Sequence, residues 1–209
     1  MKLLYLVRKD MKKMRKKAKV CVGLFLCLSL ITGCGNSSEL KLSDVKKDTL
    51  YISEDNSIEL INVEEFEKDY YNESDLKTFI EDAIDTYSKN NDGKVKLEDF
   101  SVEDKIAKSL LTFDSPETYE GFQKVDFQIV ETDAIEGNLV LPEKFQSVKG
   151  DSTVDKDTVL AEDDLQLLIV NEPLNIKLDG TIKYYAGASI TGDNEAEVTG
   201  EDSAIIAYK

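Results

Sequence analysis

Near the start of the chain lies an apolar run at residues 20–31, interrupted only by Gly23 and Ser29. A helix needs about 20 apolar residues to cross a bilayer, so this run is too short to span one. Eight Lys or Arg side chains precede it between residues 8 and 19. A basic region followed by a short apolar run is typical of a secretory signal. We therefore expect residues 1–33 to be a targeting segment, with Met1, Met11 and Met14 as alternative starts.

The apolar run ends in Leu30, Ile31, Thr32 and Gly33, directly before Cys34. This arrangement resembles the lipobox of bacterial lipoproteins, in which aliphatic and small residues precede a cysteine. The resemblance implies a signal peptide over residues 1–33, cleavage between Gly33 and Cys34, and lipid attachment (a diacylglyceryl thioether) on Cys34. It also implies a protein held at the cell membrane and facing outside the cytoplasm. The alternatives are an ordinary signal peptide with an incidental cysteine, or an uncleaved anchor.

The remaining chain is strongly acidic. Residues 1–33 hold nine of the 26 basic residues and one of the 42 acidic ones, so Cys34 onward carries 17 bases and 41 acids, a net charge of about −24. Such a body offers no basic patch to displace counterions from phosphates, which argues against nucleic acid as a partner. It also repels anionic headgroups, so membrane attachment has to be hydrophobic.

Residue counts exclude several kinds of site. The chain has no histidine, which rules out Ser-His-Asp triads, Cys-His dyads and histidine-ligated metals. It has no tryptophan, and its cysteines are Cys21, Cys27 and Cys34. Cys34 is the only one outside the targeting segment, so no internal disulfide can form after cleavage. We expect no cofactor and a fold held by its core alone.

Residues 34–47 are small and polar, and we expect a flexible tether there. A first unit over residues 48–141 begins with strands predicted at 50–53 and 58–63. Apolar side chains then recur at spacings of three and four from Leu76 to Tyr87, which predicts a long amphipathic helix capped by Asn72. Further strands are expected at 95–102 and 106–113, and a short helix at Ser115-Pro116.

The second unit, residues 142–209, is predicted to be mostly β and could share one core with the first. We expect a hairpin between 127–130 and 138–141, a polar connection over 143–157, and a buried strand over 165–170. Asp179-Gly180 is a favoured hairpin turn and predicts pairing of 174–178 with 181–186. Short strands follow at 189–191, 196–198 and 203–208. The fold class is therefore α+β: antiparallel hairpins with one long amphipathic and one short helix, then a mostly-β part resembling a small sandwich or barrel.

The body also resembles small uncharacterised lipoproteins of clostridial-type bacteria. The residues that carry this resemblance are the lipobox, Asp69-Tyr70-Tyr71, and the closing Ile205-Ile206-Ala207-Tyr208-Lys209. The group has no assigned activity, so the resemblance implies a location and a fold expectation only.

Three patterns are candidate binding features. Residues 88–99 resemble an EF-hand calcium loop through Asn90, Asp92 and Gly93, but Ser88 replaces the opening Asp and Asp99 replaces the closing Glu. The alternative is a helix end followed by an Asn-Asp-Gly turn. The acids Asp151, Asp155, Asp157, Glu162, Asp163 and Asp164 could bind a cation or form a solvated loop. The pairs Tyr70-Tyr71 and Tyr184-Tyr185 could be recognition aromatics or packing residues.

These observations favour a non-catalytic lipoprotein: a binding, adhesion or envelope-associated module whose partner would be an envelope protein or polymer. One alternative is the solute-binding receptor of a transporter, although such receptors usually have two α/β lobes. The other is a carboxylate-based glycosidase, which needs only two acids and for which the sequence nominates no pair.

Overall fold

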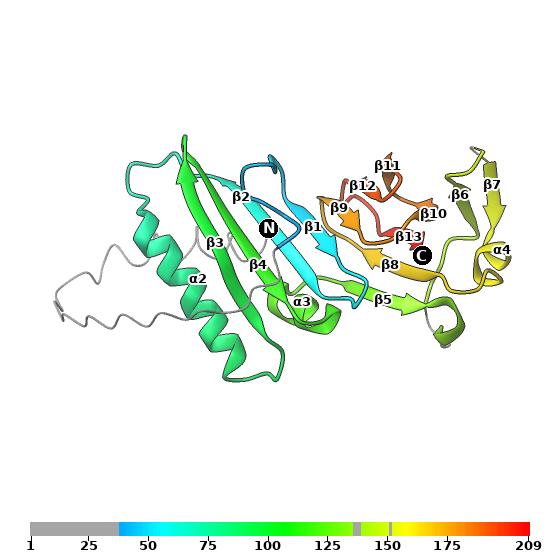
Figure 1. Ribbon diagram of the computed structural model, residues 1–209, viewed down its shortest axis with the longest axis horizontal. Coiled ribbons are helices and arrows are strands. Elements are labelled where there is room, and N and C mark those ends of the chain that lie inside the picture. Colours follow the sequence, from blue (N-terminus) through cyan, green and yellow to red (C-terminus); the bar gives the residue numbers. More distant parts are fainter. Residues whose placement is uncertain (1–37, 136–138, 151) are drawn as a thin grey trace.

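The computed structural model describes residues 38–135, 139–150 and 152–209. Within these residues the body is mostly β, with thirteen strands in two sheets and three α-helices. This agrees with the coarse expectation of an α+β protein with a strand-rich body. Figure 1 shows α2 over the β3–β4 end of the molecule, with β6, β7 and α4 at the opposite end.

The seven-stranded sheet has the order β11-β12-β9-β1-β2-β4-β3. Its neighbours are antiparallel except for β1 and β9, which run parallel. The strands are β1 (Thr49–Ile52), β2 (Ile58–Glu65), β3 (Val95–Glu103), β4 (Ile106–Phe113), β9 (Leu174–Leu178), β11 (Ser189–Gly192) and β12 (Glu195–Val198).

The six-stranded sheet has the order β5-β8-β13-β10-β6-β7, with every pair antiparallel. Its strands are β5 (Phe127–Glu131), β6 (Lys144–Ser147), β7 (Ser152–Asp155), β8 (Gln166–Val170), β10 (Ile182–Ala186) and β13 (Ala204–Tyr208). The helices are α2 (Glu73–Ser88), α3 (Pro116–Gln123) and α4 (Lys156–Leu160), with a 3₁₀ turn, η1, at Thr132–Ala134.

Side chains at the helix starts explain where α2 and α3 begin. The Asn72 side chain accepts a hydrogen bond from the Asp75 amide (3.1 Å), and Ser115 accepts one from the Thr118 amide (3.2 Å). Pro116 follows Ser115 at the first turn, where a missing N–H costs nothing. Both helices bury side chains in the core, Leu76 and Ile80 from α2 and Tyr119 from α3.

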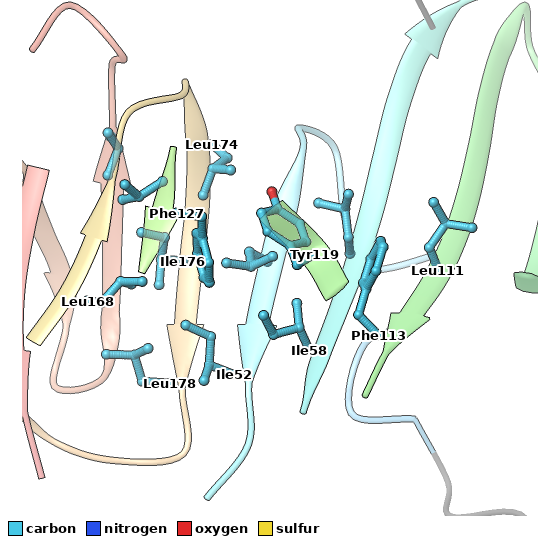
Figure 2. Close-up of a cluster of buried hydrophobic side chains, with 14 of the residues drawn as sticks. Ile52, Ile58, Leu111, Phe113, Tyr119, Phe127, Leu168, Leu174, Ile176 and Leu178 are labelled. Atoms are coloured by element: carbon cyan, nitrogen blue, oxygen red, sulfur yellow. The ribbon is translucent and has the colours of Figure 1, made fainter. Parts of the chain in front are cut away.

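One hydrophobic core lies between the sheets and draws on both predicted units. It contains Leu50 and Ile58 from the first unit and Leu168 and Ile206 from the second, all at most 3% exposed. Figure 2 shows Tyr119 within this cluster together with Phe113 and Phe127, whose rings contact its own. Residue 142 therefore does not separate two cores, because the β1–β9 pairing joins the units into one sheet.

The predicted hairpin across Asp179-Gly180 is wrong. β9 and β10 lie in different sheets, and the chain crosses from one to the other at these residues. The Asp179 amide still donates to the Ile52 carbonyl in the first sheet (2.8 Å), whereas the Thr181 amide donates to the Lys209 carbonyl in the second (2.8 Å). A Cβ on Gly180 would lie 3.0 Å from the Tyr208 ring, so this glycine allows a close approach of the carboxyl-terminal strand.

Two neighbouring expectations are also wrong. β5 pairs with β8, with Phe127 opposite Val170, and residues 139–141 form no strand. Val140 is 90% exposed. Residues 143–157, expected to be a polar connection, contain the β6–β7 hairpin and the start of α4. The burial of Phe145 and Ser147 on alternate positions of β6 explains why this polar segment forms a strand.

The described part of the predicted tether, residues 38–47, is packed rather than extended into solvent. We call it the N-terminal strap. Leu40, Leu42 and Val45 are each at most 8% exposed. They form a small cluster with Tyr51, Ile61 and Leu110, which project from the face of the seven-stranded sheet that points away from the core. The prediction failed because three apolar residues in a polar segment matched no regular period.

Candidate functional site

A cavity of about 640 Å³ opens where the ends of both sheets meet. Its walls come from the β1–β2 turn, from residues 131–133 at the end of β5 and the start of η1, from the α4–β8 connection, from the β9–β10 crossing and from the carboxyl-terminal residues. Seven carboxylate side chains line it together with one cation, Lys209. We call it the acidic pocket.

A polar contact in the acidic pocket is centred on Glu162. Lys209 Nζ lies 2.9 Å from Glu162 Oε1, and the Tyr184 hydroxyl donates to Glu162 Oε2 at 2.8 Å. The hydrogen bond from Lys209 is the main reason that the Glu162 pKa is lowered. The hydrogen bond that the Tyr184 hydroxyl donates to this carboxylate raises the pKa of Tyr184. Glu162 is therefore held ionised, bridging β10 and the carboxyl terminus.

Main-chain bonds hold the pocket walls in place. Lys209 and Thr181 exchange two backbone hydrogen bonds of 2.8 and 3.1 Å, and the Thr132 amide donates to the Leu165 carbonyl at 3.0 Å. Asp164 has a φ of 62°, a left-handed conformation that Asp tolerates better than most residues. The turn at Asp164 leads from the loop after α4 to Leu165, a buried residue directly before β8.

The chemistry of the acidic pocket is electrostatic. A concave surface lined by carboxylates concentrates cations and basic groups and disfavours anions. In the described part of the chain, no group of three or more His, Cys, Asp or Glu side chains is positioned to hold a metal ion. The acids surround the opening without converging on one point.

The acids that were predicted to lie together in one acidic loop occupy different parts of the structure. Glu162, Asp163 and Asp164 line the acidic pocket. Asp155 instead pairs with Lys144 in the β6–β7 hairpin, with Nζ and Oδ1 2.5 Å apart. Asp151 lies outside the described residues. The pocket members from the β1–β2 turn and from η1 were not predicted, because they come together only in the folded chain.

The stretch that resembles an EF-hand loop ends α2 and leads into β3. The side-chain amides of Asn90 and Asn91 donate to the Thr86 and Tyr87 carbonyls at 2.7 and 2.9 Å. These bonds satisfy carbonyls at the helix end. A Cβ on Gly93 would lie 2.2 Å from Thr118 Oγ1, so Gly93 permits close packing of this turn against α3.

The two tyrosine pairs have different surroundings. Tyr70 is 47% exposed and meets Tyr71 edge-to-face at 4.9 Å, and Tyr71 in turn lies 5.1 Å from the Phe66 ring. Tyr184 packs partly against residues on the outer side of the six-stranded sheet. Tyr185 pairs with Ile206 of β13 within that sheet.

A partly buried polar contact that the sequence did not predict joins α3 to the β8–β9 connection. The hydroxyl of Tyr119, which is 1% exposed, donates to Glu172 Oε1. Burial raises the pKa of Tyr119 well above its ordinary value, and the nearby Glu172 carboxylate raises it further. The residues are 53 positions apart, and no sequence period links them.

Gly33 and Cys34, the predicted cleavage and lipidation residues, lie outside the described residues. Across residues 38–135, 139–150 and 152–209, the helices include none with the length and apolar character of a membrane span. No protein-family model, curated protein or solved structure matches the chain.

Proposed function

We propose that this protein is a membrane-anchored extracytoplasmic lipoprotein that carries its lipid on Cys34 and presents a non-catalytic binding or envelope-associated domain. The observation that carries the proposal is the order of features before Cys34. A basic region and a short apolar run are followed by Ile31-Thr32-Gly33, and Cys34 is the only cysteine from that point onward. Its thiol therefore has no internal partner that would compete with acylation.

A lipid anchor fits the electrostatics of the body. With a net charge of about −24 beyond Gly33, the domain is repelled by anionic headgroups and requires a hydrophobic attachment. Each buried methylene contributes about 0.8 kcal/mol to membrane binding, so two acyl chains hold a protein stably where a single chain binds reversibly.

The fold fits a single binding domain better than a solute receptor with two moving lobes. The parallel β1–β9 pairing and the shared core join the two halves of the domain into one body. In this proposal α2 is an amphipathic cover of that core, with Leu76 and Ile80 buried beneath it. The acidic pocket is one concave surface available to a partner, and its charge favours a cationic or basic ligand.

The proposal is tested by expressing the full chain and its Cys34→Ala variant with a radiolabelled palmitate precursor. We expect the unaltered chain to be labelled and membrane-bound, and the variant to lose the label and leave the membrane fraction. Cys27→Ala, a cysteine within the apolar run, is the matched control and should retain both properties. Equal labelling and membrane retention in the Cys34→Ala variant would contradict the proposal.

A further inference from the structure

The N-terminal strap is fixed to the outer face of the seven-stranded sheet by polar contacts as well as by its apolar side chains. Lys108 Nζ donates to the carbonyls of Leu42 and Val45, both at 2.7 Å. The Glu59 carboxylate accepts hydrogen bonds from the amides of Glu39 (3.2 Å) and Leu40 (2.9 Å). The strap is thus held at both its beginning and its middle.

The strap begins close to the residue that is proposed to carry the lipid. Five residue steps separate Cys34 from Glu39, which is already bonded to the sheet. A fully extended chain advances at most about 3.6 Å per residue, so the two Cα atoms are at most about 18 Å apart. Whatever conformation these residues adopt, the anchor cannot lie far from the strap.

The charge of the strap differs from that of the rest of the body. Residues 38–47 contain three lysines and two acids, a net charge of +1, whereas residues 48–209 carry 14 bases and 39 acids. Anionic headgroups therefore attract the strap itself weakly and repel the chain as a whole, while carboxylates beside the strap, among them Glu103 and Glu195, oppose that attraction.

We propose that the strap-bearing face of the seven-stranded sheet faces an anionic bilayer at close range, and that the far side of the six-stranded sheet points away from it. This inference rests on the proposed lipid anchor at Cys34. The far side is covered by α4, whose Val159 packs with Leu167 and Ile205 in a cluster on the face of the sheet opposite to the shared core. The orientation decides which surface a partner can reach.

Two single-cysteine variants measure the orientation in the full acylated protein. Ser43→Cys places an exposed thiol on the strap, and Thr158→Cys places one on α4. Neither substitution changes a charge, and acylation occupies Cys34, so each variant carries one free thiol for a fluorescent donor. The proteins are reconstituted in vesicles of phosphatidylglycerol and phosphatidylethanolamine that contain a headgroup-labelled acceptor lipid.

We expect stronger energy transfer from position 43 than from position 158. A Gly-Ser segment of about 15 residues inserted between Asn36 and Ser37 should remove the difference, because the domain then reorients freely. Lys108→Met, which removes both carbonyl contacts, should reduce the difference, whereas Lys94→Met should leave it intact.

Equal transfer from the two positions, or stronger transfer from position 158, in protein that remains on the vesicles would overturn the orientation and leave the anchor standing. Protein that lacks acyl chains and does not associate with vesicles would overturn the anchor and the orientation together.

Discussion

The Tyr119 hydroxyl donates a hydrogen bond to Glu172, and the Tyr119 ring lies in the core that the two sheets share. The Tyr119 ring lies edge-to-face with Phe113 at 5.2 Å and tilted against Phe127 at 4.6 Å. One side chain of α3 thereby contacts β4, β5 and the connection between β8 and β9. Tyr119 therefore links β4 of the seven-stranded sheet to β5 of the six-stranded sheet and to the connection between β8 and β9.

Tyr119→Phe keeps the ring packing and removes the hydrogen bond to Glu172. We expect the free energy of unfolding to fall by about 1–3 kcal/mol, because the hydrogen bond from a buried hydroxyl to a charged group is lost. Urea unfolding followed by circular dichroism measures this. Tyr70→Phe, at an exposed ring, should change the value little. Equal effects of the two substitutions would contradict a special role for the buried contact.

The tyrosines also predict a loss of stability at alkaline pH. Burial raises the pKa values of Tyr119 and Tyr208 well above their ordinary value near 10. Below pH 10 both stay protonated whether folded or unfolded, so their contribution is fully present. As the pH rises above 10, the unfolded chain loses these protons while the folded chain keeps them, which favours unfolding.

Each such tyrosine should lower the free energy of unfolding by about 1.4 kcal/mol per pH unit above pH 10. Urea unfolding between pH 9 and pH 11.5 measures the slope. Tyr119→Phe should reduce the slope of unfolding free energy against pH by about the contribution of one tyrosine. An identical slope in the variant would show that Tyr119 ionises equally in both states.

The strap should contribute to stability as part of the fold. Leu42→Ala removes a side chain that is 8% exposed, and we expect it to cost about 1–3 kcal/mol of unfolding free energy. Ser43→Ala, at the exposed neighbouring position, is the control and should cost much less. If Leu42→Ala leaves the thermal midpoint unchanged, residues 38–47 act as a flexible tether after all.

Gly93→Ala should destabilise the junction between α2, β3 and α3. The new Cβ would lie 2.2 Å from Thr118 Oγ1, and Thr118 is held by a 2.7 Å hydrogen bond to Asp114. We expect a loss of about 1–3 kcal/mol, as for other overpacked sites. Combining it with Thr118→Ala should cost less than the sum of the single changes, because the clash is shared. Gly192→Ala, whose nearest contact is 3.4 Å, is the control. Additive costs would exclude the proposed contact.

Local signals predicted the elements whose partners are close in sequence. Ser115 and Pro116 correctly predict the start of α3, and the strands expected at 95–102 and 106–113 are β3 and β4, which pair across a turn at Asp104 and Lys105. At that turn Asp104 and Lys105 both have positive φ, the backbone form that joins two antiparallel strands tightly.

The predictions that failed concerned which strands pair, which depends on segments far apart in the sequence. Asp179-Gly180 has the composition of a hairpin turn, yet β9 finds β1 and β12 as neighbours and β10 finds β13 and β6. Similarly, β8 is buried enough to accept both β5 and β13, which leaves residues 139–141 without a strand partner. The acidic pocket and the Tyr119–Glu172 contact could not be predicted for the same reason, since they unite residues that only the sheet order brings together.

The intact mass of the protein, extracted from membranes with detergent, tests directly whether Cys34 carries the lipid. The lipoprotein account predicts a chain that begins at Cys34 and carries the added mass of a diacylglyceryl group on that residue. A peptide map should place the whole addition on Cys34. A mass equal to the unmodified 23.5 kDa chain, or a processed chain with an unmodified Cys34, would contradict it.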